Sequence, residues 1–393
     1  MNTLPTTIAV IGHRFARLAT PRSVIHAIVP VLAMLTLTLG VATGSAVADW
    51  PLGRGDAQAT GSTDVRLPEN LVVKWEFSAD EPVDAPPVVV GDRVFIADIA
   101  GMVYALSAAD GQEIWRLATD IGFAGGPAVD GDLLVIGDLD GKVYGVDTET
   151  GKLRWTQDVG GEIGADAAFF DGRVLIASQD GNLYSLSRET GTLGWTYETS
   201  DQIQCSPSIA GDRTFLGGCD GNLHTVAIGD GKSSVEPLPL GGPTGSTPAI
   251  LGDRAFLPIM DGAVIAIDWK KNQELWRHVD SDRPQEYRTS PAVSGNTLVV
   301  VSQNRQVDAL DVETGEPRWR YTLRRRADAS PVIAGDDVWI ASTDGRLTRL
   351  SLADGEERWQ FEIRGQFTSG PAIVDGKLLI ADSRGIVRCF AAP

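Results

Sequence analysis

Tryptophan recurs along this chain at a nearly fixed interval, and that interval constrains the fold more than any other feature. Seven tryptophans are separated by 40, 40, 40, 81, 43 and 40 positions: Trp75, Trp115, Trp155, Trp195, Trp276, Trp319 and Trp359. The double interval holds one further repeat, in which Val235 stands at the tryptophan position. A fixed period of this length is typical of propellers and solenoids. The sequence therefore predicts eight copies of one structural unit.

Each repeat is expected to contain four short strands. In the second repeat, turn signals at Gly131-Asp132, Asp140-Gly141 and Thr150-Gly151 separate four apolar runs, the last of which contains Trp155. Glycine beside Asp, Asn or Thr marks a tight turn between strands. The runs have the length of ordinary strands, so the unit is a four-stranded antiparallel meander. One meander cannot bury both of its faces, so the copies must stack.

The two ends of the repeat region predict how the stack closes. The eighth copy stops at Phe390, after its third strand, whereas residues 71–77 form an additional fourth strand before the first copy. Pairing these segments completes the last blade, links the two ends of the ring and removes an exposed sheet edge. We therefore predict an all-β fold over residues 71–393: an eight-bladed β-propeller of four-stranded antiparallel blades, closed by its N-terminal strand.

Residues that could carry chemistry have structural interpretations in this repeat. Regularly spaced tryptophans indicate packing between blades rather than a carbohydrate platform. Asp138-Leu139-Asp140-Gly141 resembles the start of a calcium loop, but it falls on the second turn of an ordinary blade. His224 stands at the strand position that tyrosine holds in three other blades. We predict no catalytic residue, metal site or cofactor site.

Residues 1–48 have the pattern of an export signal. Three arginines precede an apolar run over residues 24–41, and Ala46-Val47-Ala48 gives a small-x-small cleavage pattern. Residues 24–48 are also long enough to cross a bilayer, so cleavage and retention as a membrane anchor both remain open. In either case residues 49–393 are expected outside the cytoplasm, in the periplasm or envelope. Membrane contact is expected only through an uncleaved N-terminus.

The chain is strongly acidic. Its formal net charge is −18, with 34 basic and 52 acidic residues. Three of the basic residues and none of the acidic residues lie before Asp49, so the remainder carries 31 − 52 = −21. A chain with this negative charge lacks the broad basic surface that binds nucleic acid or anionic lipid. We predict no nucleic-acid partner.

Three cysteines are present: Cys205, Cys219 and Cys389. No CxxC motif occurs, which argues against a zinc or thioredoxin-like site. Cys205 and Cys219 flank a turn at Gly211-Asp212, so a disulfide between them is one expectation. Two buried free thiols are the alternative.

Departures from the repeat gather in the second half of the chain. Residues 281–288 lengthen one connection between blades, and residues 320–326 give the next connection three consecutive arginines. Both connections join blades in the same register, so we expect them to lie close together on one face. Tyr and Arg are favoured contact residues, and a solvated charge run is the alternative. The candidate partner-binding residues are Arg283, Tyr287, Arg288, Tyr321, Arg324, Arg325 and Arg326.

The repeat resembles a known family. The pattern Gly-Asp…Asp-Gly-x-Val-Tyr-x-Leu-Asp…Thr-Gly-x-x-x-Trp, clearest at residues 140–155 and 180–195, is similar to the PQQ-like repeat. Families with this repeat include the quinoprotein alcohol dehydrogenases and the propeller subunit of the bacterial outer-membrane β-barrel assembly machine. Residues 49–55 resemble the Trp-Pro-x-x-Arg-Gly segment that precedes such propellers in exported bacterial proteins. We expect residues 49–70 to form an irregular arm, with Trp50 docked onto the ring.

The resemblance implies contrasting functions. The catalytic relatives carry adjacent cysteines and long loops that supply calcium ligands and a catalytic Asp, whereas this chain has no adjacent cysteines and short connections. We therefore predict a monomeric, non-catalytic scaffold that binds an envelope protein, with outer-membrane protein assembly as the specific hypothesis. The lipid-anchor cysteine of the assembly subunit is missing. A PQQ-dependent dehydrogenase-like enzyme and a sensor propeller are the alternatives, the latter binding a small ligand in a channel lined by Ser206, Thr247, Ser290 and Ser330.

Overall fold

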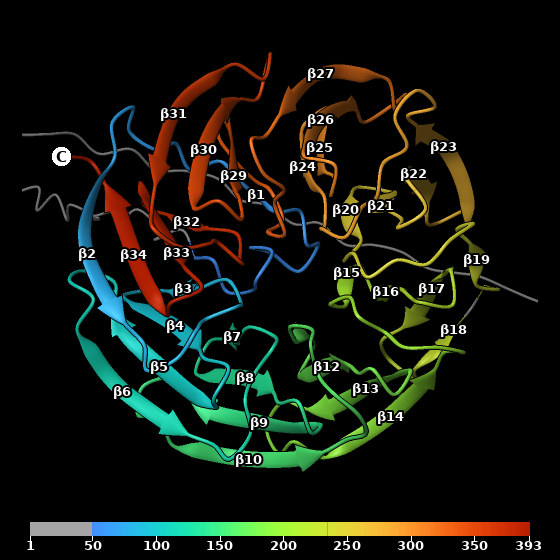
Figure 1. Ribbon diagram of the computed structural model, residues 1–393. Helices are drawn as coiled ribbons and strands as arrows, with labels where there is room; N and C mark the ends of the chain where they lie inside the picture. The colour runs from blue at the N-terminus through green and yellow to red at the C-terminus, as the bar shows by residue number, and fades with distance from the viewer. Residues whose placement is uncertain (1–48, 234) are drawn as a thin grey trace, which may run out of the picture. The chain divides into compact units, whose positions relative to one another are not determined.

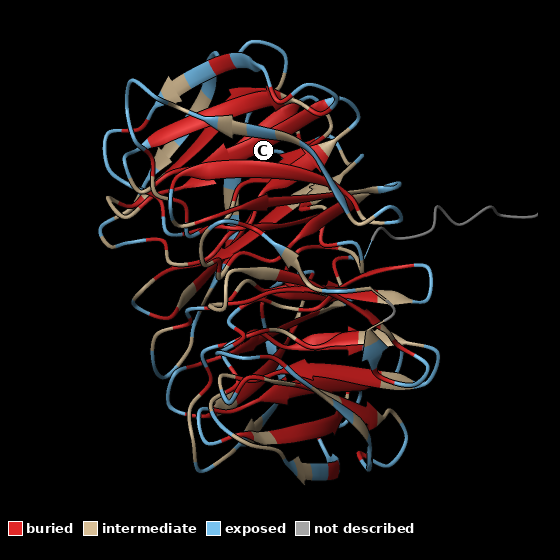
Figure 2. Cartoon of the chain, turned by 90° about the vertical axis from the view of Figure 1, so that its right-hand side faces the viewer, coloured by how far each residue is buried: buried red, intermediate tan, exposed pale blue. Residues whose placement is uncertain are grey.

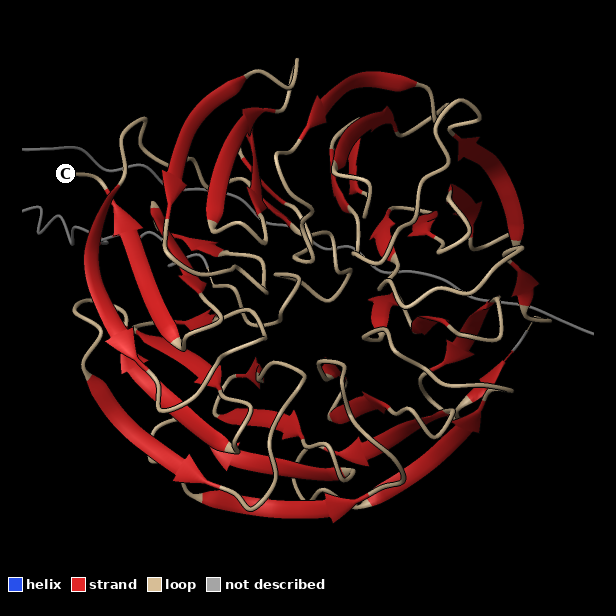
Figure 3. Ribbon diagram, in the orientation of Figure 1, coloured by secondary structure: helices blue, strands red, loops and turns tan. Residues whose placement is uncertain are grey.

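The computed structural model describes residues 49–233 and 235–393, and the predictions made for residues 1–48 lie outside these ranges. All regular structure in the described ranges is β-strand, gathered into eight sheets that follow one another around a ring (Figure 1; Figure 3). These ranges contain no helix long and apolar enough to cross a membrane. The predicted eight-bladed, all-β propeller is confirmed.

Each of the first four blades begins with a three-residue strand nearest the axis and continues outward. Blade 1 contains β3 (Val88–Val90), β4 (Arg93–Ala97), β5 (Met102–Ser107) and β6 (Glu113–Ala118). Blade 2 contains β7 (Ala128–Asp130), β8 (Leu133–Gly137), β9 (Lys142–Asp147) and β10 (Leu153–Asp158). Blade 3 contains β11 (Ala168–Phe170), β12 (Arg173–Ala177), β13 (Asn182–Ser187) and β14 (Leu193–Glu198). Blade 4 contains β15 (Ser208–Ala210), β16 (Arg213–Gly217), β17 (Asn222–Ala227) and two short outer strands, β18 (Lys232–Ser233) and β19 (Leu238–Pro239).

The last four blades repeat this order. Blade 5 contains β20 (Ala249–Leu251), β21 (Arg254–Pro258), β22 (Ala263–Asp268) and β23 (Gln273–Val279). Blade 6 contains β24 (Ala292–Ser294), β25 (Thr297–Val301), β26 (Gln306–Asp311) and β27 (Pro317–Thr322). Blade 7 contains β28 (Val332–Ala334), β29 (Asp337–Ala341), β30 (Arg346–Ser351) and β31 (Glu357–Glu362). Blade 8 contains β32 (Ala372–Val374), β33 (Lys377–Ala381), β34 (Ile386–Ala391) and β2 (Val72–Ser78).

The ring closes in blade 8, where the first long strand meets the last. β2 pairs antiparallel with β34, from Val72 opposite Ala391 to Ser78 opposite Ile386. Figure 1 shows this pairing as a blue strand beside a red one. The predicted closure is therefore confirmed, and β2 covers the edge that β34 would otherwise expose.

The repeated tryptophans lie between blades, as their spacing predicts. The indole of Trp115 packs on the third turn of blade 2, where a Cβ on Gly151 would lie 2.6 Å from the ring. Its Nε1 donates to the Thr148 carbonyl, at 3.0 Å. Five other indoles donate in the same way to the next blade: Trp75 to Ala108, Trp155 to Arg188, Trp195 to Ile228, Trp276 to Val312 and Trp319 to Leu352. The second and third strands of the blades are largely buried, as Figure 2 shows in red, whereas outer strands such as β6 and β10 are buried at the tryptophan and exposed at most other positions.

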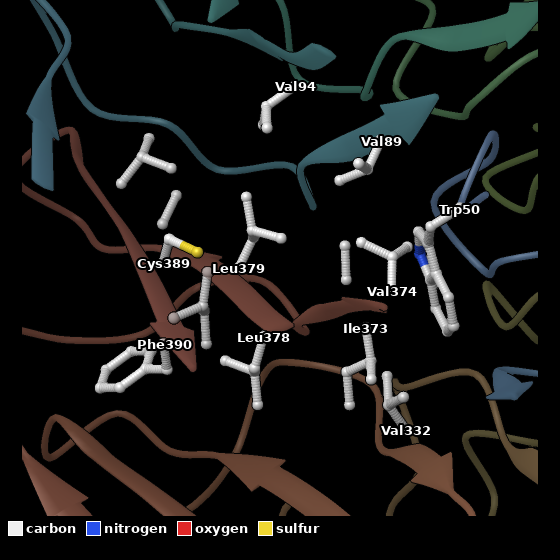
Figure 4. Packing of buried hydrophobic residues seen from close by; sticks show 14 of the residues in the cluster. Trp50, Val89, Val94, Val332, Ile373, Val374, Leu378, Leu379, Cys389 and Phe390 are labelled. Atoms are coloured by element: carbon white, nitrogen blue, oxygen red, sulfur yellow. The ribbon is translucent and has the colours of Figure 1, made fainter. Parts of the chain in front are cut away.

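Residues 49–63 form an arm that runs along the inner strands of the ring. Trp50 is only 1% exposed and pairs with Val89, and its indole lies among inner-strand side chains such as Val374 and Val332 (Figure 4). β1 (Ser62–Thr63), in the same arm, pairs parallel with β28. The arm's carbonyls accept hydrogen bonds from the middle residue of six innermost strands: Trp50 from Val89, Pro51 from Val129, Ala57 from Ile209, Gln58 from Ile250, Thr60 from Val293 and Gly61 from Ile333.

The antiparallel order separates the connections between two faces. The turn between the second and third strands of a blade lies on the same side as the connection to the next blade, because each successive strand reverses direction. We call this side the loop face. It carries both segments predicted to bind a partner, residues 281–288 and 320–326.

Candidate functional site

The cationic side chains of the loop face gather in one sector. The second turns of blades 1–5, and the connections from blade 8 through blades 1–4 up to blade 5, contain 13 Asp and Glu residues and no Lys or Arg. The remaining turns and connections, at residues 280–290, 302–305, 323–330, 342–345, 363–370 and 382–385, contain eight arginines and six Asp and Glu residues. Charge on this face therefore changes from −13 in one sector to 8 − 6 = +2 in the other. We call the second part the basic sector; its arginines are Arg283, Arg288, Arg305, Arg324, Arg325, Arg326, Arg364 and Arg384.

The two predicted arginine segments lie side by side in this sector. Arg305, Arg325 and Arg326 line a hollow of about 800 Å³ that reaches across blades 6–8 and also includes Gln366. A second hollow, of about 490 Å³, lies between Arg288 and Arg326. Arg326 borders both hollows, so the structure brings together the connections that the repeat register placed on one face.

Several guanidinium groups in the sector lack a carboxylate partner. Arg288 pairs with Glu286 at 2.6 Å, and Arg326 lies 3.2 Å from Asp328. Within the described residues no ion pair involves Arg283, Arg305, Arg324, Arg325 or Arg364. These exposed guanidinium groups can donate hydrogen bonds to the carboxylates of another protein without breaking an ion pair within this chain.

The two candidate tyrosines lie outside this basic surface. Tyr287 is 1% exposed and its backbone pairs with Ser302, so the prediction that it contacts a partner is wrong. Tyr321 is half-buried in the outer strand β27 and donates to Glu357 of blade 7 at 2.6 Å. Burial is the main cause, and the hydrogen bond to Glu357 the second, that raises the pKa of Tyr321 to about 12. Proximity in sequence grouped both residues with the arginines, but backbone pairing turns Tyr287 inward.

Three arginines of the sector were missed by sequence reasoning. Arg305 and Arg384 lie in the second turns of blades 6 and 8, and Arg364 lies in the connection to blade 8. The backbone of Arg305 has φ 69°, in the left-handed region where the other second turns have glycine. Aligning the repeats and comparing charge at their turns would have found all three.

The residues predicted to line the channel do so. Ser206, Thr247, Ser290 and Ser330 lie around an axial pocket of about 200 Å³ on the loop face. Asp166 stands at the equivalent position of blade 3 and lines the same pocket. The floor includes Gly53 and Arg54 of the arm.

The two paired-cysteine candidates are free thiols. The register of β15 and β16 aligns Ser208 with Phe215, and its continuation puts Gly218, not Cys219, opposite Cys205. The Cys205 thiol instead contacts the backbone of Gly217, with Sγ 3.1 Å from the carbonyl oxygen. Burial raises the pKa of Cys205 to about 12. The structure therefore supports unbonded thiols and not the disulfide, but only Cys205 is buried, whereas Cys219 is half-buried.

The axial pocket does not suit a quinone cofactor of the dehydrogenase type. A planar tricarboxylate needs flat apolar walls and compensating positive charge, whereas this pocket is lined by Asp84, Asp166 and Asp328 against a single arginine, Arg54. Neither an aromatic side chain nor a cysteine is among its lining residues. No step of quinone chemistry is therefore assigned to this site.

The closed ring, the interlocked tryptophans and the short turns define a propeller of the PQQ-like repeat class. The sequence profile of a family described as "Outer membrane protein assembly factor BamB" matches residues 72–118, 99–268 and 260–391, so the chain belongs to this family.

Similarity to solved structures extends over most of the chain. The crystal structure of BamB from Moraxella catarrhalis has a TM-score of 0.73 and 19% identity, covering 82% of this chain and 98% of that chain. A europium-containing methanol dehydrogenase has a TM-score of 0.76 and 13% identity, covering 88% of this chain and 98% of that chain. A curated relative, the serine/threonine-protein kinase AfsK of Streptomyces griseus, is 44% identical over 54 residues, which are 12% of this chain and 7% of the kinase. The structural likenesses show the fold alone.

Proposed function

We propose that this chain is an exported, non-catalytic scaffold that binds a protein of the cell envelope through its basic sector. The specific hypothesis is a role in outer-membrane protein assembly. Membership in the family described as an outer membrane protein assembly factor supports this direction. The signal-like pattern of residues 1–48 supports export to the periplasm or envelope.

The observation that carries the proposal is the charge division of the loop face. A sector of net charge +2 beside one of net charge −13 can orient an approaching partner before contact. The partner should present carboxylates to Arg324, Arg325 and Arg326 and keep its own acidic surface away from blades 1–5. Arginine suits such contacts because its planar guanidinium binds carboxylate with two hydrogen bonds.

Charge reversal tests the proposal. The full chain carrying Arg324→Glu, Arg325→Glu and Arg326→Glu should fold normally and lose its partner in a cross-linking capture from native envelope. Binding of the captured partner to the unaltered chain should weaken with salt, as expected for association steered by charge.

A matched control carries Lys74→Glu, Lys152→Glu and Lys232→Glu, which change the net charge equally at exposed positions away from the basic sector. This control should capture the partner as well as the unaltered chain does. Equal capture by the arginine variant would remove the basic sector from the proposal. Mass spectrometry of the captured protein tests the finer hypothesis, which requires a component of outer-membrane protein assembly.

A further inference from the structure

The axial pocket is bordered at its inner end by the arm. Its walls are the segments that precede the innermost strands of the eight blades, whose connections converge on the axis in Figure 3. The arm crosses deeper, at the middle residues of those strands, and contributes Gly53 and Arg54 to the lining. A pocket of about 200 Å³ can hold a small molecule but not a folded polymer.

One side of this pocket is a belt of hydroxyl groups. The backbone N–H that precedes the innermost strand of one blade donates to the hydroxyl of the next blade, at 3.0 to 3.1 Å: Asp166 to Ser206, Ser206 to Thr247, Thr247 to Ser290 and Ser290 to Ser330. Each hydroxyl is thus used as an acceptor. None of the four donates to an acceptor among residues 49–233 and 235–393, so four O–H groups can donate to a ligand in the pocket.

Asp166 is the one charged residue at this position of the repeat. The other seven blades have Pro86, Gly126, Gly370 or one of the four hydroxyl residues there. Its Oδ1 accepts from the Gly126 N–H at 2.6 Å, and no hydrogen bond to Oδ2 is formed by the described residues. Burial raises the pKa of Asp166 to about 6. The ionised carboxylate therefore destabilises the native fold at neutral pH, which is typical of a residue kept for function.

The second charged group is Arg54, which comes from the arm. It is 8% exposed, its Nη2 donates to the Pro291 carbonyl at 2.7 Å, and its Nε has no partner among the described residues. Arg54 is attracted more strongly by Asp56 of the arm than by Asp166, and it forms no ion pair with Asp166 within 4.0 Å. A guanidinium and a carboxylate thus line one small pocket without neutralising each other directly, which is a costly arrangement in a buried site.

We propose that the axial pocket binds a small zwitterion of the size of an α-amino acid, with its ammonium group on Asp166 and its carboxylate on the hydroxyl belt and Arg54. The four O–H donors and the guanidinium match a carboxylate, and the unpaired Oδ2 matches an ammonium group. Asp84 and Asp328, which also line the pocket, disfavour an isolated anion. The volume admits a short side chain only. This site shares Ser290, Asp328 and Ser330 with the connections of the basic sector but includes none of the eight arginines of that sector. It does not depend on the proposed function.

Calorimetric titration of the full chain with L-alanine and L-serine tests the proposal. At least one of them should bind saturably, whereas acetate and ethylamine, which each carry half of the zwitterion, should bind at least tenfold more weakly. Asp166→Asn should weaken amino-acid binding at least tenfold, because the ammonium group loses its counter-charge. Asp140→Asn, an exposed carboxylate on the same face, is the matched control and should bind as the unaltered chain does.

The amide resonance of Gly126, whose N–H donates to Asp166, should shift on titration with the bound amino acid and should not shift in Asp166→Asn. Circular dichroism of Asp166→Asn shows whether this variant keeps its β-structure, and Arg54→Lys, which keeps the charge, should weaken binding less than Asp166→Asn. The proposal is overturned if neither amino acid binds at 50 mM, if acetate binds as tightly as L-alanine, or if a folded Asp166→Asn binds with unchanged affinity. Loss of partner capture by the arginine variant leaves this experiment unaffected.

Discussion

Six of the eight junctions between blades share one construction, and the junction between blades 4 and 5 departs from it. The junction between blades 7 and 8 has no third-turn glycine, because the fourth strand of blade 8 is β2, and Trp359 there meets Phe390 edge to face. In the six, an indole from one blade covers the third-turn glycine of the next and donates to a nearby carbonyl, as Trp155 does with Gly191 and Arg188. Between blades 4 and 5 both partners are replaced together, by Val235 and by Asn272 with φ 52°. Indole and glycine therefore behave as one unit, because a side chain at the glycine would occupy the space of the ring.

The departing junction is packed by a different indole. Trp269, which lies just after β22 in blade 5, meets Phe215 of blade 4 edge to face, with ring centroids 5.3 Å apart. Its Nε1 donates to Gly252 of its own blade at 3.0 Å rather than across the junction. Asn272 provides a polar link instead, because its side-chain amide donates to the Glu236 carbonyl at 3.0 Å. Apolar contact between blades is thus kept while the interlocking contact is lost.

Removing a docked indole should have the largest effect. Trp155→Ala should lower the free energy of unfolding by about 3–5 kcal/mol, because it leaves a cavity between blades 2 and 3 and removes the hydrogen bond to Arg188. Chemical denaturation measures this loss. Trp269→Ala at the departing junction should cost less, because that indole is more exposed and bonds within its own blade. Equal losses would show that the two junctions are energetically alike.

Adding a methyl group to the glycine partner should have the next largest effect. A Cβ on Gly191 would lie 2.5 Å from the Trp155 ring, and its φ of 71° already disfavours a side chain. Gly191→Ala should therefore cost about 1–3 kcal/mol in the same measurement. Gly211→Ala separates the two causes, because Gly211 has φ 59° but a Cβ added there would meet no atom within 4 Å. If both variants lose the same stability, contact with the indole contributes nothing.

The periodic part of the molecule could be predicted from sequence, and the remainder depends on contacts that periodicity does not encode. The turns and the tryptophans recur at fixed positions, so they specified the blades, the closure by β2 and the hydroxyls around the axis. The path of the arm is not periodic, and its bonds to inner strands, such as Ala57 with Ile209, join segments far apart in sequence. The repeat pattern also does not show which way a side chain points in a long connection. Tyr287 was therefore predicted to lie on the surface, although it is buried. Arg305, by contrast, could have been found from sequence by aligning the second turns of the eight repeats and comparing their charges.

Asp166 is a second departure from the repeat, and it tests whether a residue at an irregular position lowers the stability of the fold. Its pKa of about 6, raised by burial from 3.8, means that the native state holds a proton more tightly than the unfolded chain does. Stability should therefore fall as pH rises from about 4 through 6. Asp166→Asn removes this dependence and should stabilise the protein by about 1–2 kcal/mol at pH 7, after allowance for the open mouth of the pocket, with little difference near pH 4. Thermal unfolding at several pH values checks this, and a pH-independent difference would contradict it.

Rebuilding the missing contact between blades 4 and 5 should have the smallest effect and sharpens the comparison most. Val235→Trp alone should change stability by less than about 0.5 kcal/mol, because Asn272 occupies the place where the indole would lie. Asn272→Gly alone loses the hydrogen bond to Glu236 while relieving the positive φ, so its effect should also be small. In the double variant the indole and the glycine can dock as in the six junctions that share this contact. A double-mutant cycle should then show a favourable coupling of about 1 kcal/mol. Additive effects would mean that the fixed position of the tryptophan does not depend on the glycine, and that each contributes to the junction independently.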